Sequence, residues 1–146
     1  MSARAQENVR LWEEHLNGEF VTKNENLSLA TMVEDASVLT MPTRWGGKGK
    51  EALRPLYRDE FIPSIPPEWE HTLTNRVATD NCVVEEATVR FHHTQQMDWF
   101  LPGVPPTDKW ITVELVIVVD FRDGKMAAER IYWDQAAVLR QIGLLA

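Results

Sequence analysis

Residues Lys125–Leu145, KMAAERIYWDQAAVLRQIGLL, are the most informative about the fold, because their apolar side chains change spacing part-way along the segment. Before Asp134 they alternate at Ala127, Ile131 and Trp133, as in a β-strand with one buried face. After Asp134 they recur every three or four residues, as on one face of a helix. The sequence therefore predicts a strand that runs directly into a short helix.

Asp134 stands at this change of spacing and has two interpretations. Aspartate is a preferred residue for the N-cap of a helix, and Gly143 is a suitable C-terminal stop for the same helix. A carboxylate at the end of a pocket-lining strand is also a candidate general acid or base. The two roles are compatible, and the sequence leaves both open.

The composition predicts one globular domain that spans residues 1–146. With 146 residues and 44% apolar content, the chain is long enough to bury roughly 70% of the surface of its unfolded form. A core of that size needs neither a disulfide nor a cofactor for stability. The only cysteine, Cys82, excludes an internal disulfide and a multi-cysteine metal site.

The charge and hydropathy patterns exclude two classes of partner. The formal net charge of −7, without a basic stripe, disfavours nucleic acid. The longest apolar run, Leu115–Val119, is too short for a membrane span, and the start MSARAQENVR lacks the apolar core of a signal peptide. We therefore expect a soluble cytoplasmic protein without a nucleic-acid or membrane partner.

The first half of the chain predicts helices around one short strand. A stripe at helical spacing defines the first helix, and its members are Ala5, Val9, Trp12, Leu16 and Phe20. His15 lies beside this stripe within reach of an interior pocket, although a histidine there is more often a packed residue. A strand is expected over Ala36–Met41. Another helix, up to Phe61, has to start late or bend because of Pro55.

The second half predicts an antiparallel sheet. Four strands are expected, over Glu70–Ala78, Cys82–Gln95, Trp110–Arg122 and Met126–Trp133, with tight turns at Asp80-Asn81 and Asp123-Gly124. In the third of these strands an apolar face alternates with a mixed face that carries too much apolar surface to remain in water. We therefore expect a homodimer in which this face of the sheet meets a second copy.

The segment from Asp98 to Asp108 is long for an antiparallel connection and rich in bulky apolar residues. Loops of this length often act as lids or binding loops. A rigid, proline-rich turn packed on the edge of the domain explains the composition equally well. The sequence does not choose between the two.

Of the two adjacent histidines, His92 and His93, only one can face the interior of a strand. Alternation places His93 with Val89 and Phe91, so His93 is the predicted interior histidine. A buried carboxylate near such an imidazole is suited to proton abstraction next to a carbonyl. No metal site is expected, because adjacent histidines do not converge on one ion and no HExxH motif is present.

Two segments carry a resemblance to a known family. FLPGVPPTDKW, at Phe100–Trp110, and DGKMAAERIYWDQAAVLRQIGLL, at Asp123–Leu145, are similar to the SnoaL-like polyketide cyclases of the nuclear transport factor 2-like superfamily. The resemblance implies an α+β, cone-shaped (cystatin-like) fold, in which N-terminal helices pack on a curved, mostly antiparallel sheet. EHLNGEFVTKNENLSLATM, at Glu14–Met32, is similar to a bacterial subgroup without an assigned reaction, related to domains found beside dienelactone hydrolases.

The resemblance also implies roles for particular residues. Asp134 matches the strand-end carboxylate that acts as acid and base in the cyclases, and His93 matches the histidine of a His-Thr pair. Asp108 stands where glycine is usual. The Arg-x-Asp of the related epoxide hydrolase is replaced by Arg90-Phe91-His92, which argues against epoxide hydrolysis.

We therefore expect a small-molecule acid/base enzyme of the cyclase, isomerase or dehydratase type. It would act, without a cofactor, on a carbonyl-containing hydrophobic substrate in an apolar pocket, with Asp134 and His93 as catalytic residues. The predicted substrate-binding residues are Tyr57, Trp99, Trp110, Glu114 and Trp133. The alternative is a non-catalytic domain that binds a small ligand or mediates dimerisation, because the fold alone does not decide function.

Overall fold

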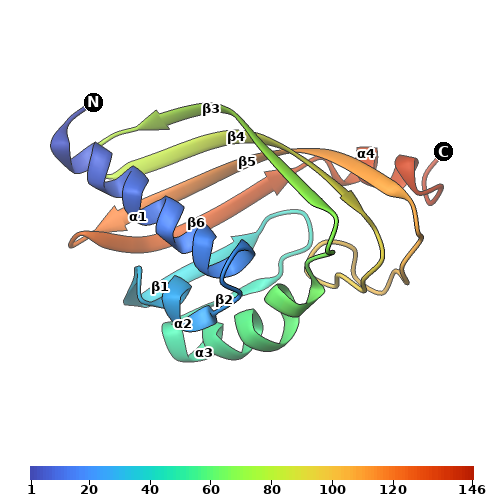
Figure 1. Cartoon of the computed structure of the whole chain (residues 1–146), viewed down its shortest axis with the longest axis horizontal. Helices are drawn as coiled ribbons and strands as arrows, with labels where there is room; N and C mark the ends of the chain where they lie inside the picture. The colour runs from blue at the N-terminus through green and yellow to red at the C-terminus, as the bar shows by residue number, and fades with distance from the viewer.

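The computed structural model describes all 146 residues, Met1–Ala146, as helices packed against one side of a curved sheet (Figure 1). The helices are α1 (Ala3–Phe20), α2 (Glu25–Leu29), α3 (Lys50–Pro55) and α4 (Gln135–Gln141). The strands are β1 (Met32–Thr40), β2 (Gly46–Lys48), β3 (Trp69–Ala78), β4 (Cys82–His92), β5 (Trp110–Arg122) and β6 (Lys125–Trp133). The predicted α+β class is confirmed.

The six strands form one sheet in the order β2-β1-β6-β5-β4-β3, and only the β1–β6 pair is parallel. The meander from β3 to β6 therefore follows chain order, as predicted. Asp123 and Gly124 both have positive φ values, 54° and 73°, which is the backbone geometry of a tight hairpin turn. β1 starts at Met32, four residues earlier than the expected strand, because its first residues pair with the start of β6.

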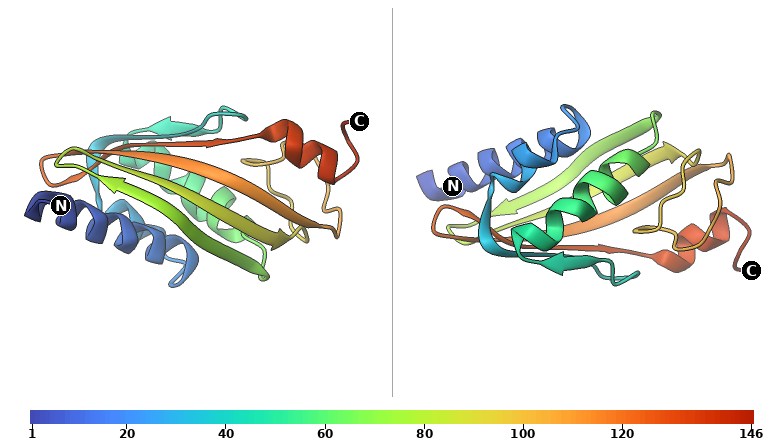
Figure 2. Two further views of the ribbon diagram at one scale, coloured as in Figure 1. Left: turned by 90° about the horizontal axis from the view of Figure 1, so that it is seen from above. Right: turned by 90° about the horizontal axis from the view of Figure 1, so that it is seen from below.

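The two faces of the sheet differ. Seen from above, the strands face the viewer with α3 behind them, and seen from below, α1 and α3 lie in front of the strands (Figure 2). Along β5, Ile111, Val113, Ile117 and Val119 are buried under the helices, whereas Thr112, Glu114 and Val116 are exposed on the other face. The core therefore lies in the concave side of the sheet.

Pro55 ends α3, and the chain continues as a π-helical segment, η1 (Leu56–Phe61), and a short 3₁₀ turn, η2 (Ile62–Ser64). Proline lacks the amide hydrogen that a regular helix needs at this point, so the hydrogen-bonding pattern changes there. The predicted bend is thus absorbed by a wider helical turn. This turn places Tyr57 and Phe61 in the core.

The connection between β4 and β5 is packed rather than open. Met97, Trp99, Phe100 and Leu101 are all buried, and the ring of Phe100 stacks on that of Trp133 at 4.9 Å. The packed-turn interpretation of this segment is confirmed. Because Trp99 and Phe100 also line the interior cavity, the connection closes one end of the cone.

Candidate active site

An apolar cavity of about 50 Å³ lies between the helices and the concave face of the sheet. Its walls are mostly aromatic and aliphatic side chains, among them Trp12, Phe61, Trp99, Phe100 and Ile117. Two carboxylates, those of Glu19 and Glu129, interrupt this apolar lining, and both side chains are buried. A charged group in such a place needs a partner, because burial without one is costly.

The partner is His15, which is fully buried between the two carboxylates. Its Nε2 lies 3.0 Å from Oε1 of Glu19 and 3.5 Å from Oε1 of Glu129. The hydroxyl of Tyr57 lies 3.3 Å from the same nitrogen. These four groups, His15, Glu19, Glu129 and Tyr57, form what we call the polar cluster. Glu19 and Glu129 also line a second, smaller hollow on the Tyr57 side of the cluster.

Local structure explains how α1 contributes two members of the cluster. His15 and Glu19 are one helical turn apart, so their side chains lie next to each other on one face of the helix. Gly18 lets α2 approach this turn closely, because an added Cβ would lie 2.4 Å from Oγ of Ser28. The backbone of Ser28 is thereby held beside the imidazole of His15.

The other ring nitrogen of His15 fixes where its proton lies. Nδ1 is 3.0 Å from the carbonyl oxygen of Ser28 and 2.9 Å from the hydroxyl oxygen of Thr31. The Thr31 hydroxyl itself donates to the Ser28 carbonyl, at 2.6 Å, so both neighbours act as acceptors toward the ring. Nδ1 therefore carries a proton. A neutral ring would then present a lone pair from Nε2 to Glu19, so their 3.0 Å separation requires a second proton between them.

The pKa shifts agree with a positively charged His15. Burial lowers its pKa, but the negative charges of Glu19 and Glu129 outweigh burial and raise the pKa to about 10. Burial raises the pKa of Glu19, and the charge of His15 opposes that effect. Burial and the two carboxylates also hold the pKa of Tyr57 well above its ordinary value. Perturbed ionisable groups in a cavity are typical of a functional site.

Glu129 is the member of the cluster that faces the cavity without a hydrogen bond at Oε1. It lies opposite Val119 in the β5–β6 ladder and belongs to the inward-facing side of β6, with Ile131 and Trp133. The alternation that predicted this strand therefore also gives the direction of Glu129. That alternation is the signal in the sequence that indicates the inward direction of Glu129.

Asp134, the predicted catalytic carboxylate, lies at the surface. It is the N-cap of α4, and its side chain accepts a hydrogen bond of 3.1 Å from the amide of Ala137. It does not line the interior cavity. The capping interpretation is confirmed, and the catalytic role of Asp134 stays a prediction without a cavity beside it.

His93 is buried, as predicted, while His92 lies on the opposite face of β4 against Trp110. The Nδ1 atom of His93 accepts a hydrogen bond of 3.2 Å from the amide of Thr107, so it ties the long connection to β4. Burial lowers the pKa of His93, which favours a neutral ring. His93 does not line the interior cavity either, and its catalytic role likewise stays a prediction.

The five predicted substrate-binding residues separate into three groups. Trp99 lines the cavity, and Tyr57 belongs to the polar cluster. Trp133 is buried, but its indole donates to Gln135 at 2.7 Å and its ring packs on Phe100, outside the cavity lining. Trp110 and Glu114 lie on the outer face of the sheet, where Trp110 packs on Arg90. The alternation along β5 places both with Thr112, away from the core.

The polar cluster is also the donor set that a divalent cation would require. One imidazole nitrogen and two carboxylate oxygens, from His15, Glu19 and Glu129, lie within 4.8 Å of one another. The distance between Nε2 of His15 and Oε1 of Glu19 equals that of a normal hydrogen bond, so a shared proton already accounts for this contact.

None of the helices combines the length and the apolar character that a bilayer crossing requires.

The sequence model of the SnoaL-like polyketide cyclase family matches residues 9–142 of this chain. The chain belongs to this family. Family membership confirms the predicted nuclear transport factor 2-like fold. None of the curated protein sequences matches the chain.

Solved structures of this family's fold are similar over nearly the whole chain. A protein from Jannaschia sp. CCS1, assigned to the SnoaL-like polyketide cyclases, has a TM-score of 0.77 at 18% identity, covering 100% of this chain and 98% of its own. AclR from Streptomyces galilaeus, for which a hydroxylase function has been suggested, has a TM-score of 0.72 at 17% identity, covering 97% and 88%. TerC, crystallised with polyporic acid, has a TM-score of 0.67 at 14% identity, covering 94% and 98%. At these identities the likeness shows the fold.

Proposed function

We propose that this protein binds a small, carbonyl-containing hydrophobic molecule inside the cone and transfers a proton on it, as a cyclase, isomerase or dehydratase does. The observation that carries the proposal is the polar cluster, in which an imidazolium is held between two buried carboxylates at the edge of an apolar cavity. Membership of the SnoaL-like family supports a small-molecule ligand.

Glu129 is the proposed proton acceptor. The Glu129 side chain lines the cavity, and its Oε1 atom is held by an ion pair with Nε2 of His15 at 3.5 Å rather than by a hydrogen bond, so the carboxylate remains able to accept a proton from a C–H or O–H group of the ligand. When Glu129 takes up a proton, the positive charge of His15 remains paired with Glu19. Neutralisation of Glu129 therefore does not leave His15 as an unpaired charge in the core, so the proton transfer to Glu129 carries no large electrostatic penalty.

Replacement of Glu129 by Gln tests this assignment, because glutamine keeps the shape and cannot accept the proton. The first step is a thermal-shift screen against steroids, aromatic polyketides and lactones, followed by mass spectrometry for products. We expect Glu129→Gln to lower turnover of the substrate found by at least about a hundredfold, the usual contribution of a general base. Unchanged turnover in this variant would refute the role of Glu129.

The competing assignment places Asp134 and His93 at the chemistry, as the resemblance implied. Asp134→Asn keeps a capping side chain and removes the proton chemistry. We expect normal turnover in this variant, and a loss comparable with that of Glu129→Gln would favour the competing assignment. Binding without any product would favour a non-catalytic ligand-binding domain.

We also propose a homodimer formed through the outer face of the sheet. Val77, Val116 and Tyr132 on that face are 56%, 38% and 39% exposed, respectively. Val77 pairs with Val84, and Val84 pairs with Val118, so apolar side chains continue across three strands. No helix covers this face in the monomer (Figure 2), and a second copy of the sheet would remove it from water.

A further inference from the structure

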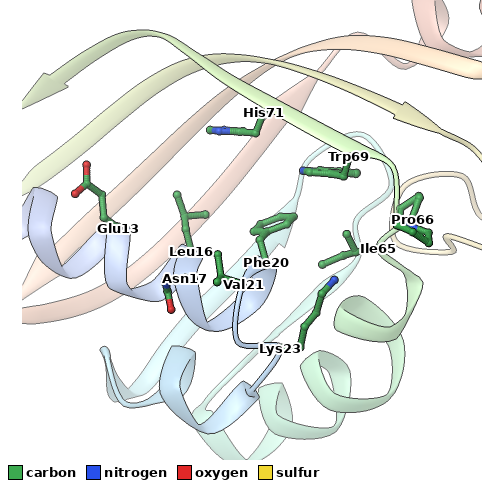
Figure 3. A pocket seen from close by; sticks show the side chains of 11 residues that line it. Glu13, Leu16, Asn17, Phe20, Val21, Lys23, Ile65, Pro66, Trp69 and His71 are labelled. Atoms are coloured by element: carbon green, nitrogen blue, oxygen red, sulfur yellow. The ribbon is translucent and has the colours of Figure 1, made fainter.

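A groove of about 500 Å³ runs along the surface between the C-terminal half of α1 and the start of β3 (Figure 3). It is ten times larger than the interior cavity, which is about 50 Å³. Four residues line both spaces: Leu16, Phe20, Trp69 and His71. The groove and the cavity are therefore neighbours, separated by this one layer of side chains.

Phe20 and Trp69 form the aromatic part of the separating layer. Their rings stack with centroids 5.4 Å apart, and Figure 3 shows them one above the other beside Ile65. Trp69 also stacks on Phe91, at 5.1 Å, on the inward face of the sheet. Phe20 is the last residue of α1 and is partly exposed, and its ring contacts Phe61 of the core at 6.0 Å, so it is the part of the layer that joins the surface to the interior.

The layer contains a polar atom that has no partner. The indole nitrogen of Trp69 is buried and makes no hydrogen bond. The same is true of the indole nitrogen of Trp12 and of Oε1 of Glu129, whose side chains line the same cavity. An unsatisfied buried donor destabilises the free protein, and an acceptor on a ligand would remove that penalty. Two N–H donors and one carboxylate acceptor thus belong to the lining of one small space.

We propose that groove and cavity form one bipartite site, entered past Phe20, in which Trp69 binds the ligand by donating its indole N–H to an oxygen acceptor. A space of about 50 Å³ holds only a carbonyl and the carbon next to it, whereas the groove holds the rest of the molecule. The ligand is therefore an elongated molecule with an apolar body and a small oxygen-bearing end. This inference rests on the proposed function for the role of the oxygen-bearing end.

The probe is 4-phenyl-2-butanone, an aromatic body with one terminal ketone, and its matched partner is butylbenzene, which lacks the oxygen. Affinities are measured by ligand-observed NMR titration of the intact protein. We expect Trp69→Phe, which keeps an aromatic ring and removes the N–H, to weaken ketone binding about five- to tenfold and to leave butylbenzene binding unchanged. Trp110→Phe, on the outer face, is the matched control and should change neither affinity.

An equal loss for both probes, no loss for the ketone, or no binding of either probe would overturn the inference. Circular dichroism of Trp69→Phe checks that the variant is folded, and Phe20→Ala gives an independent test, because opening the separating layer should speed association of the ketone. A Phe20→Ala rate equal to that of the wild type would exclude entry at this point.

The same samples separate this inference from the proposed function. Exchange of the hydrogens next to the ketone with D₂O reports proton transfer by Glu129, not binding by Trp69. A selective loss of ketone affinity in Trp69→Phe, together with no hydrogen exchange in the wild-type protein, would support the bipartite site and count against the proposed catalysis. Exchange that depends on Glu129 but not on Trp69 would support the catalysis and overturn the bipartite site.

Discussion

Nε2 of His15 lies 3.0 Å from Oε1 of Glu19, while Nδ1 of the same ring faces two acceptors. This relationship requires a proton on each side of the imidazole. The second proton lies between His15 and Glu19, and the pKa of His15, raised to about 10 by the two carboxylates, favours the ring as its holder, so the centre of the cone is a buried imidazolium between carboxylates.

Replacement of Glu19 by Gln tests the charge of His15 directly. The carboxylate of Glu19 is one of two that raise the pKa of His15 to about 10, against the effect of burial. We expect the variant to have a lower His15 pKa, measured by NMR titration of the imidazole resonances. Glu13→Gln, an exposed change on the same helix, should leave it unaltered. An unchanged His15 pKa in Glu19→Gln would show that the carboxylate does not hold the proton.

The stability of the protein should fall between about pH 6.5 and pH 10. A pKa raised from 6.5 to about 10 means that the folded state holds the proton more tightly than the unfolded state. The resulting stabilisation is complete below the unfolded pKa and disappears as the pH rises through the folded one. We expect a loss of roughly 2–4 kcal/mol across this window.

Urea unfolding at several pH values measures this dependence. His15→Gln should flatten most of the profile between pH 6.5 and pH 10, whereas His92→Gln, at a half-buried histidine whose pKa is raised by its hydrogen bond to Glu68, should remove only a smaller part of it. A wild-type profile that is level over the same range would contradict the imidazolium assignment.

Asp134 should matter for stability through its cap. Asp134→Ala removes the oxygen that accepts from the amide of Ala137, and we expect a loss of about 1 kcal/mol in the free energy of unfolding. Asp134→Asn should lose no more than a few tenths of that amount, because asparagine caps equally well. Equal losses in the two variants would show that the cap is not what Asp134 contributes.

Divalent cations should not stabilise the protein. The contact between His15 and Glu19 is already occupied by a proton, which a metal ion would have to displace. We expect Zn²⁺, Mn²⁺ and EDTA each to leave the melting temperature unchanged at neutral pH. Stabilisation by Zn²⁺ that disappears in Glu129→Gln would instead identify the polar cluster as a metal site.

The outer face of the sheet should hold two copies together. We expect light scattering to give a dimer mass at micromolar concentration, and Val116→Asp to give a monomer, because Val116 lies beside Tyr132 on this face and the new charge would be buried in the interface. Leu144→Asp, an exposed change near the C-terminus, is the control. A monomer mass for the wild-type protein would rule out this interface.

Much of the fold was predictable because it depends on short-range patterns. The alternation along β5 and β6, the turn at Asp123-Gly124 and the cap at Asp134 are all local, and each was found where it was expected. The sequence also predicted that His93, not His92, is buried. The first residues of β1 were less predictable, because their pairing with β6 decides them. The π-helical segment after Pro55 was less predictable too, because the packing of Tyr57 in the core decides it.

The candidate site could not be predicted in the same way. The spacing of His15 and Glu19 brings these two together on α1, but Tyr57 lies on the π-helical segment and Glu129 on β6, and nothing in the sequence places them beside that pair. Charged residues at inward positions are normally rare, so a pattern argument passes over them. Their burial becomes favourable only when opposite charges meet, which happens after the helices have folded onto the sheet.

The elements, the two faces of the sheet and the cap at Asp134 thus follow from local sequence, since alternation, helical spacing and capping act over a few residues. The tertiary structure decided which carboxylate faces the cavity. It placed Glu129 beside His15 and left Asp134 at the surface, because the curvature of the sheet and the position of α1 determine what lies within reach of the interior.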